Sequence, residues 1–133
     1  MVGWVINLIA GLFILLSIIG FGRFFIKTAI SGEINMFLGY RSPMSTKNKE
    51  TWAFAHLYCG RLWWRAGLIM LPLIIAVMIV LLFFVRNENV EITVVILGVV
   101  ATQGVPVLFL IISIILTEIA LRKNFDRLGN RRY

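Results

Sequence analysis

Residues 66–85 read AGLIMLPLIIAVMIVLLFFV, an unbroken run without a charged side chain. A helix of about 20 residues, rising ~1.5 Å per residue, matches the ~30 Å hydrocarbon core of a bilayer. The whole chain has the same character, because 60% of its residues are hydrophobic and 14% are charged, against ~45–50% and ~25% in soluble proteins. The run therefore predicts a membrane-spanning helix in an all-α integral membrane protein.

Two further apolar stretches lie on either side of this run, at about 2–22 and 92–120. The first has no preceding Lys or Arg and exceeds the ~7–15-residue apolar core of a signal peptide, so we expect it to be retained as a helix. The second is longer than an untilted span requires, and Pro106, which lacks an N–H, predicts a kink at residues 102–106. We expect one domain, 1–133, with three transmembrane helices.

Basic residues are unevenly placed around the predicted spans. The short loop 86–91 has only Arg86, whereas the loop 23–65 and the C-terminal tail are rich in Lys and Arg. These basic residues are Arg23, Lys27, Arg41, Lys47, Lys49, Arg61, Arg65, Arg122, Lys123, Arg127, Arg131 and Arg132. Since Lys and Arg are retained on the cytoplasmic side, we expect the loop 23–65 and the tail to be cytoplasmic and the N-terminus to lie outside.

The formal net charge of +7 raises the question of a nucleic-acid partner. The sequence carries no motif that reads nucleic acid, and Lys and Arg beside membrane spans are attracted to anionic lipid headgroups. We therefore expect membrane lipids as partners and no nucleic acid.

Residues 46–64 predict an amphipathic helix lying in the cytoplasmic headgroup region. Ser45 is the expected N-cap, and Glu50 would favour the positive end of the helix dipole. At about 100° per residue, one face of this helix gathers Trp52, Ala55, Cys59, Leu62 and Trp63. Neither face is purely polar, which is typical of an interfacial helix anchored by Trp, Tyr and Arg. Simple membrane anchoring of the aromatic residues is the alternative to a binding role.

The same loop carries a set of short motifs. They are Ile34-Asn35, Gly39-Tyr40-Arg41-Ser42-Pro43, Ser45, Asn48, Glu50-Thr51-Trp52, Ala55-His56 and Gly60-Arg61-Leu62-Trp63. This combination resembles the signature of the SdpI family of bacterial membrane proteins over about residues 30–85. His56 stands where that family often has Asn, and Ser42 replaces the commoner Thr.

The resemblance implies a multi-pass protein of the bacterial cell membrane that gives immunity to a secreted, membrane-active protein toxin. It also implies a signalling role in which a repressor is held at the membrane. The motif residues that it implicates in binding a partner or lipid are Asn35, Gly39, Tyr40, Arg41, Pro43, Asn48, Trp52, His56, Gly60 and Trp63. For Arg41 we favour a lipid phosphate or an internal pair with Glu33 or Glu50, and a partner carboxylate is the other alternative.

Three polar side chains lie at membrane depth, Asn7 on the first span and Thr102 and Gln103 beside Pro106 on the third. An unpaired amide in hydrocarbon is costly, so we expect hydrogen bonds between helices rather than a substrate path. Near the cytoplasmic end, we expect Glu118 to pair with the basic residue one turn further on.

The sequence offers no combination of residues suited to catalysis. His56 and Cys59 are spaced i, i+3, but a metal site needs three or four ligands, and Cys59 lacks a base held by an orienting partner. We expect no catalytic residue, metal or cofactor. A small accessory subunit of a larger membrane complex is the main alternative function. A transporter or membrane enzyme is less favoured, because no ionisable side chain lies deep in a span.

Overall fold

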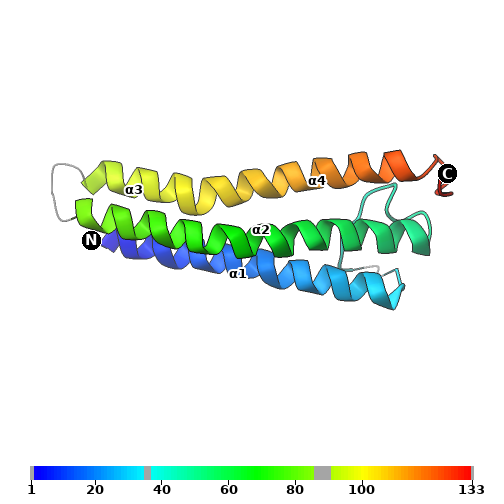
Figure 1. Cartoon of the computed structure of the whole chain (residues 1–133), viewed down its shortest axis with the longest axis horizontal. Helices are drawn as coiled ribbons and strands as arrows, with labels where there is room; N and C mark the ends of the chain where they lie inside the picture. Colours follow the sequence, from blue (N-terminus) through cyan, green and yellow to red (C-terminus); the bar gives the residue numbers. More distant parts are fainter. Residues whose placement is uncertain (1, 35–36, 86–90, 133) are drawn as a thin grey trace.

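The computed structural model describes residues 2–34, 37–85 and 91–132. The predicted loop residues Asn35 and Arg86 lie outside the described residues. In the described part, long helices lie side by side in an elongated bundle (Figure 1). The fold is therefore the predicted all-α class.

The described residues form three rods that lie side by side, each running in the opposite direction to the one before it (Figure 1). The first is α1, Val2–Ser31, and the second is α2, Lys49–Phe84. The third consists of α3, Glu91–Val99, a π-helical segment η2, Val100–Gly104, and α4, Val105–Asn124. We call it the α3–α4 rod.

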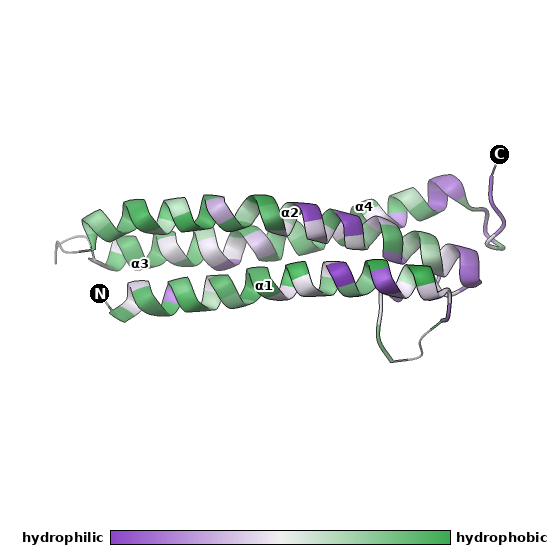
Figure 2. Cartoon of the chain, turned by 60° about the horizontal axis from the view of Figure 1, so that its bottom comes forward, coloured by the Kyte–Doolittle hydropathy of each residue, from purple (hydrophilic) through white to green (hydrophobic). Residues whose placement is uncertain are grey.

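Each rod is long and apolar enough to cross a membrane. Among the described residues, the candidate spans are Val2–Ser31, Lys49–Phe84 and Ile92–Asn124. Hydrophobic residues cover most of the bundle, and hydrophilic residues gather toward one end, which also carries the C-terminus (Figure 2). Large apolar side chains such as Phe13 and Phe83 are 73% and 79% exposed, as expected of a surface that faces lipid. The predicted number of spans is confirmed.

The predicted separate interfacial helix at 46–64 is not formed. Those residues from Lys49 onward are instead the first part of α2, which continues into the membrane span without a break. The change of polarity near Arg65 predicts a boundary between the helix 46–64 and the span 66–85, but α2 contains no proline before Pro72. A change of polarity alone leaves the backbone hydrogen bonds of a helix intact, so the helix has no reason to end there.

The α3–α4 rod is irregular where Pro106 interrupts its hydrogen bonding. The π-helical segment η2 ends two residues before Pro106, and the N–H of Val105 donates to the carbonyl of Val100, five residues earlier. A proline cannot donate to the preceding turn, and a π-helical turn is one way in which a helix absorbs that loss. The irregularity overlaps residues 102–106, the region in which the sequence predicts a kink.

Polar side chains join the rods at membrane depth. Asn7 Nδ2 donates to the carbonyl of Val95 at 3.0 Å, and Gln103 Nε2 donates to Asn7 Oδ1 at 3.3 Å. These bonds tie α1 to the α3–α4 rod. Thr102 Oγ1 donates instead to the carbonyl of Gly98 in its own rod, at 2.7 Å.

A close approach of α1 and α2 depends on two glycines. A Cβ on Gly22 would lie 2.6 Å from the backbone nitrogen of Trp64, and a Cβ on Gly60 would lie 2.8 Å from the carbonyl oxygen of Gly22. Helices in membranes pack through such small residues because their backbones can then touch. Gly60 belongs to the sequence motif, and the structure adds Gly22 as its partner.

Candidate functional site

Residues 37–48, which we call the motif loop, lie at the hydrophilic end of the bundle (Figures 1 and 2). Tyr40 fixes this loop to two rods at once. Its backbone N–H donates to His56 Nε2 in α2 at 2.9 Å, and its hydroxyl donates to the carbonyl of Ile114 in α4 at 3.2 Å. Tyr40 is 9% exposed. The loop is therefore anchored from its interior.

His56 is a buried anchor rather than a free base. It is fully buried, its Nε2 accepts the Tyr40 N–H, and its Nδ1 lies 2.8 Å from the carbonyl oxygen of Trp52. This pattern assigns a neutral imidazole with the proton on Nδ1, because one nitrogen accepts and the other donates. Both ring nitrogens are engaged, so neither is available to a metal or to a nucleophile such as Cys59.

The position before Tyr40 requires a glycine, and the motif has Gly39 there. Its φ is +134°, and a Cβ there would lie 2.3 Å from His56 Nε2 and 2.9 Å from Trp52 Cη2. The rings of Trp52 and His56 are in contact, with centroids 4.0 Å apart and planes tilted by 37°. A side chain at position 39 would be strained and would also displace this ring pair. The sequence motif thus encodes one packed cluster of Gly39, Tyr40, Trp52 and His56.

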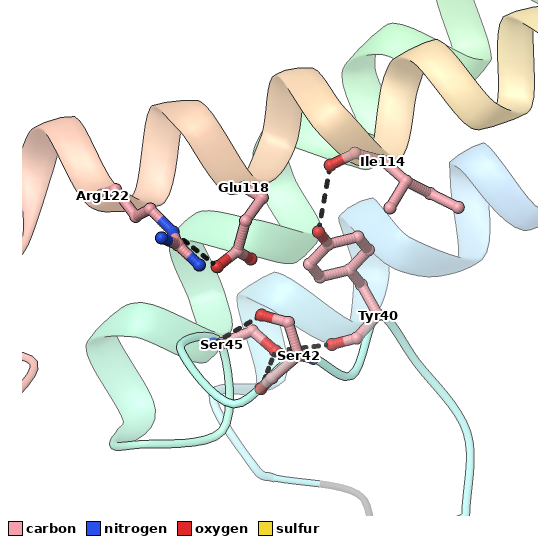
Figure 3. A network of polar contacts seen from close by, with 6 residues as sticks. All are labelled: Tyr40, Ser42, Ser45, Ile114, Glu118 and Arg122. Carbon is pink, nitrogen blue, oxygen red and sulfur yellow. Dashed lines mark hydrogen bonds and ion pairs between the residues drawn. The ribbon is translucent and has the colours of Figure 1, made fainter.

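Two serines close the loop behind Tyr40 (Figure 3). Ser45 Oγ accepts from the Ser42 N–H at 2.8 Å and donates to the carbonyl of Tyr40 at 3.0 Å. In return, the Ser45 N–H donates to Ser42 Oγ at 3.1 Å. Ser45 is fully buried, so these bonds satisfy groups that water cannot reach. Ser45, predicted as a helix cap, therefore holds the turn.

The N-cap of α2 is Asn48. Asn48 Oδ1 accepts from the Thr51 N–H at 2.9 Å, and Thr51 Oγ1 accepts from the Asn48 N–H at 3.1 Å, which completes a reciprocal capping arrangement. Asn48 Nδ2 donates to the carbonyl of Gly129 at 2.8 Å. One side chain thus starts the helix and holds the C-terminal tail.

The tail, residues 125–132, is an ordered part of the site that the sequence reasoning missed. Phe125 is 1% exposed, and Lys47 Nζ donates to the carbonyl of Arg127. Asp126 Oδ1 accepts from the N–H groups of Leu128 and Asn130, both at 2.8 Å. The pKa of Asp126 lies below its usual value, chiefly because of the bond from the Asn130 backbone. Asp126 followed by Gly129, whose φ is +92°, is the available turn signal.

The remaining motif residues that the structure describes lie toward the same end of the bundle. Trp63 Nε1 donates to Ser113 Oγ in α4 at 2.7 Å, so it joins two rods. Arg41 and Pro43 are exposed on the motif loop. Glu50, considered above as a partner for Arg41, pairs with Arg131 of the tail at 3.7 Å.

The predicted ion pair on α4 is present. Arg122 Nε lies 3.2 Å from Glu118 Oε1, one turn away. Together with the bonds of Tyr40, Lys47 and Asn48 described above, this places the motif loop, the tail and the end of α4 next to one another at the hydrophilic end of the bundle.

A model of the SdpI/YfhL protein family matches residues 32–120, which is more than half of the chain. The match covers the motif loop, α2 and most of the α3–α4 rod. Searches of curated proteins and of solved structures found no match to the chain.

Proposed function

The chain belongs to the SdpI/YfhL protein family, and from this premise we propose that it protects the membrane against a secreted, membrane-active protein toxin. It is a multi-pass membrane protein, and its role needs no enzymatic chemistry. The motif loop supports the proposal because buried Tyr40 and His56 hold it on the bundle, beside the start of α2, which carries the surface described below. A fixed loop at one end of three spans suits recognition at the membrane surface.

The proposed orientation places the motif loop and the tail in the cytoplasm of a bacterium and the N-terminus outside. Support comes from the distribution of charge, because the Lys and Arg residues of the described part of the chain lie in residues 23–65 and 122–132. Hydrophilic residues gather toward the end of the bundle that carries the C-terminus (Figure 2). Such residues are retained on the cytoplasmic side during insertion.

A groove on α2 offers a surface for an inserted toxin helix. Its lining comprises Phe54, Leu57, Tyr58, Arg61, Leu62, Arg65, Ala66 and Ile69. The floor is apolar and the two arginines are exposed, so the groove suits an apolar helix that ends in an acidic or carbonyl group near the headgroups. Packing between spans is the main source of association within a bilayer. Toxin held in this groove is kept from assembling with other toxin molecules.

Bacterial survival tests this function. A sensitive strain expressing the protein is exposed to membrane-active protein toxins, beside the double variant Arg61→Ala/Arg65→Ala. The matched control is Lys27→Ala/Lys49→Ala, which removes the same charge from exposed positions outside the groove. Immunoblots of membrane fractions establish equal expression.

We expect the wild type and the lysine control to protect, and the arginine variant to lose most protection. Absence of protection by the wild type against every toxin tried, together with stoichiometric recovery of one membrane protein in a mild-detergent pull-down, would favour the accessory-subunit alternative.

A further inference from the structure

A cleft runs along α4 beneath the motif loop and the tail, and we call it the α4 cleft. Its apolar part is lined by Tyr40, Ser42, Ile114, Ile115 and Ile119. Its charged part is lined by Met44, Lys47, Phe125, Asp126, Arg127 and Arg132. Pro43, Glu118 and Arg122 line both parts, so the two parts adjoin each other at these residues.

The lining of the cleft changes from apolar to charged along its length, as a bilayer does from its hydrocarbon core to its headgroups. Ile115 and Ile119 are 54% and 57% exposed on the outer face of α4. The charged part begins at Arg122, one turn beyond Glu118. It lies at the end of the bundle where hydrophilic residues gather (Figure 2). A ligand filling the whole cleft must be apolar at one end and polar at the other.

The charge of the polar part favours an anion. Four basic side chains face two carboxylates there. Arg122 uses Nε for its ion pair with Glu118, and its side chain is 76% exposed. A guanidinium carries five N–H donors in a planar fork that suits phosphate oxygens. Arg132, also exposed, lies in the same lining.

Glu118 adds a second requirement. Its Oε1 meets Arg122, but its Oε2 is buried and accepts no hydrogen bond from the part of the chain that the structure describes. The carboxylate lies between Tyr40 and Arg122, where the two parts of the cleft join (Figure 3). A buried carboxylate oxygen without a donor is costly, so the ligand should bring a hydrogen-bond donor to this point.

We propose that the α4 cleft binds an anionic phospholipid whose headgroup carries hydroxyl groups. The phosphate lies between Arg122 and Arg132, a headgroup hydroxyl donates to the Glu118 carboxylate, which is 24% exposed, and an acyl chain follows Ile115 and Ile119. A serine headgroup, although anionic, carries a carboxylate beside its ammonium group, and this carboxylate would enter a site that already holds Glu118 and Asp126. A zwitterionic lipid would lack the net charge that the basic residues attract. This inference is independent of the proposed function.

Native mass spectrometry of the full-length protein tests the proposal, with phosphatidylglycerol, phosphatidylserine, phosphatidylethanolamine and phosphatidylcholine of identical acyl chains. We expect phosphatidylglycerol to be retained about tenfold more strongly than phosphatidylserine, a difference of about 1.4 kcal/mol. Equal retention of these two lipids would overturn the proposal, because with equal net charge and identical acyl chains they differ only in the headgroup that would meet Glu118.

Three variants locate the site. Arg122→Gln/Arg132→Gln should lower phosphatidylglycerol retention about tenfold, whereas Arg61→Gln/Arg65→Gln, which removes the same charge from the α2 groove, should not. Glu118→Gln keeps the size of the side chain but removes the repulsion of a second carboxylate, so phosphatidylserine should approach phosphatidylglycerol in retention. Equal losses in the two arginine variants, or unchanged selectivity in Glu118→Gln, would contradict the assigned site.

Discussion

The backbone N–H of Tyr40 donates to Nε2 of the buried His56 across a gap of 2.9 Å, and this bond joins the motif loop to α2. On the other side of the ring, Nδ1 meets the Trp52 carbonyl at 2.8 Å. The imidazole therefore links the motif loop to α2, and we expect its loss to destabilise the motif loop before the rest of the bundle.

Replacing His56 with Ala removes the acceptor of the Tyr40 N–H and leaves a cavity beside Trp52. We expect the free energy of unfolding to fall by about 2–4 kcal/mol. His56→Gln keeps an acceptor of similar reach and should lose less than half as much. Thermal unfolding in mild detergent measures the stability of both variants. Equal destabilisation by Ala and Gln would show that the hydrogen bond to the Tyr40 N–H does not contribute to stability.

Gly39→Ala should displace the motif loop. Its positive φ and the contact with His56 Nε2 both oppose a Cβ, so we expect a loss of about 2–4 kcal/mol. Gly32→Ala is the matched control, because Gly32 has a φ of +66° but open space around it. The control should cost only about 1 kcal/mol. Comparable melting temperatures for the two variants would refute the packing argument.

Asn48→Asp separates helix capping from attachment of the tail. Aspartate keeps the oxygen that caps Thr51 but replaces the amide donor that meets the Gly129 carbonyl. We expect trypsin to cleave after Arg127 several-fold faster, while stability changes by less than about 1 kcal/mol. Mass spectrometry of the digest follows the cleavage. A cleavage rate equal to that of the wild type would mean that this bond does not hold the tail.

Burial raises the pKa of Tyr40 to about 12, and the charge of Glu118 acts in the same direction. The folded state therefore holds the phenolic proton more tightly than the unfolded state, whose pKa is about 10. The resulting stability is complete below pH 10 and is lost as the pH rises toward 12. Tyr40→Phe should lack this component of the alkaline loss. Parallel decline of wild type and variant between pH 10 and 12 would contradict the assignment.

The three spans could be predicted because runs such as 66–85 have the length and composition that a bilayer demands. The irregularity before Pro106 was also predictable, since the missing N–H is a local property. The continuity of α2 could not be predicted, because the change of polarity near Arg65 resembles the end of a helix although α2 continues through it.

The long-range contacts of the site were beyond local sequence reasoning. Both Ser45 and Asn48 are suitable helix caps, and the choice between them is decided by the bond of Ser45 to the Tyr40 carbonyl. The attachment of the tail depends on Asn48 meeting Gly129, which lies 81 residues away. Neither contact leaves a periodic pattern in the sequence.

Leakage of dye from toxin-treated lipid vesicles tests the central claim most directly. Vesicles with and without the purified protein are exposed to a membrane-active protein toxin against which the expressing strain survives. We expect the wild type to suppress leakage and Arg61→Ala/Arg65→Ala not to do so. Equal leakage with and without the wild-type protein would contradict protection of the membrane by this chain.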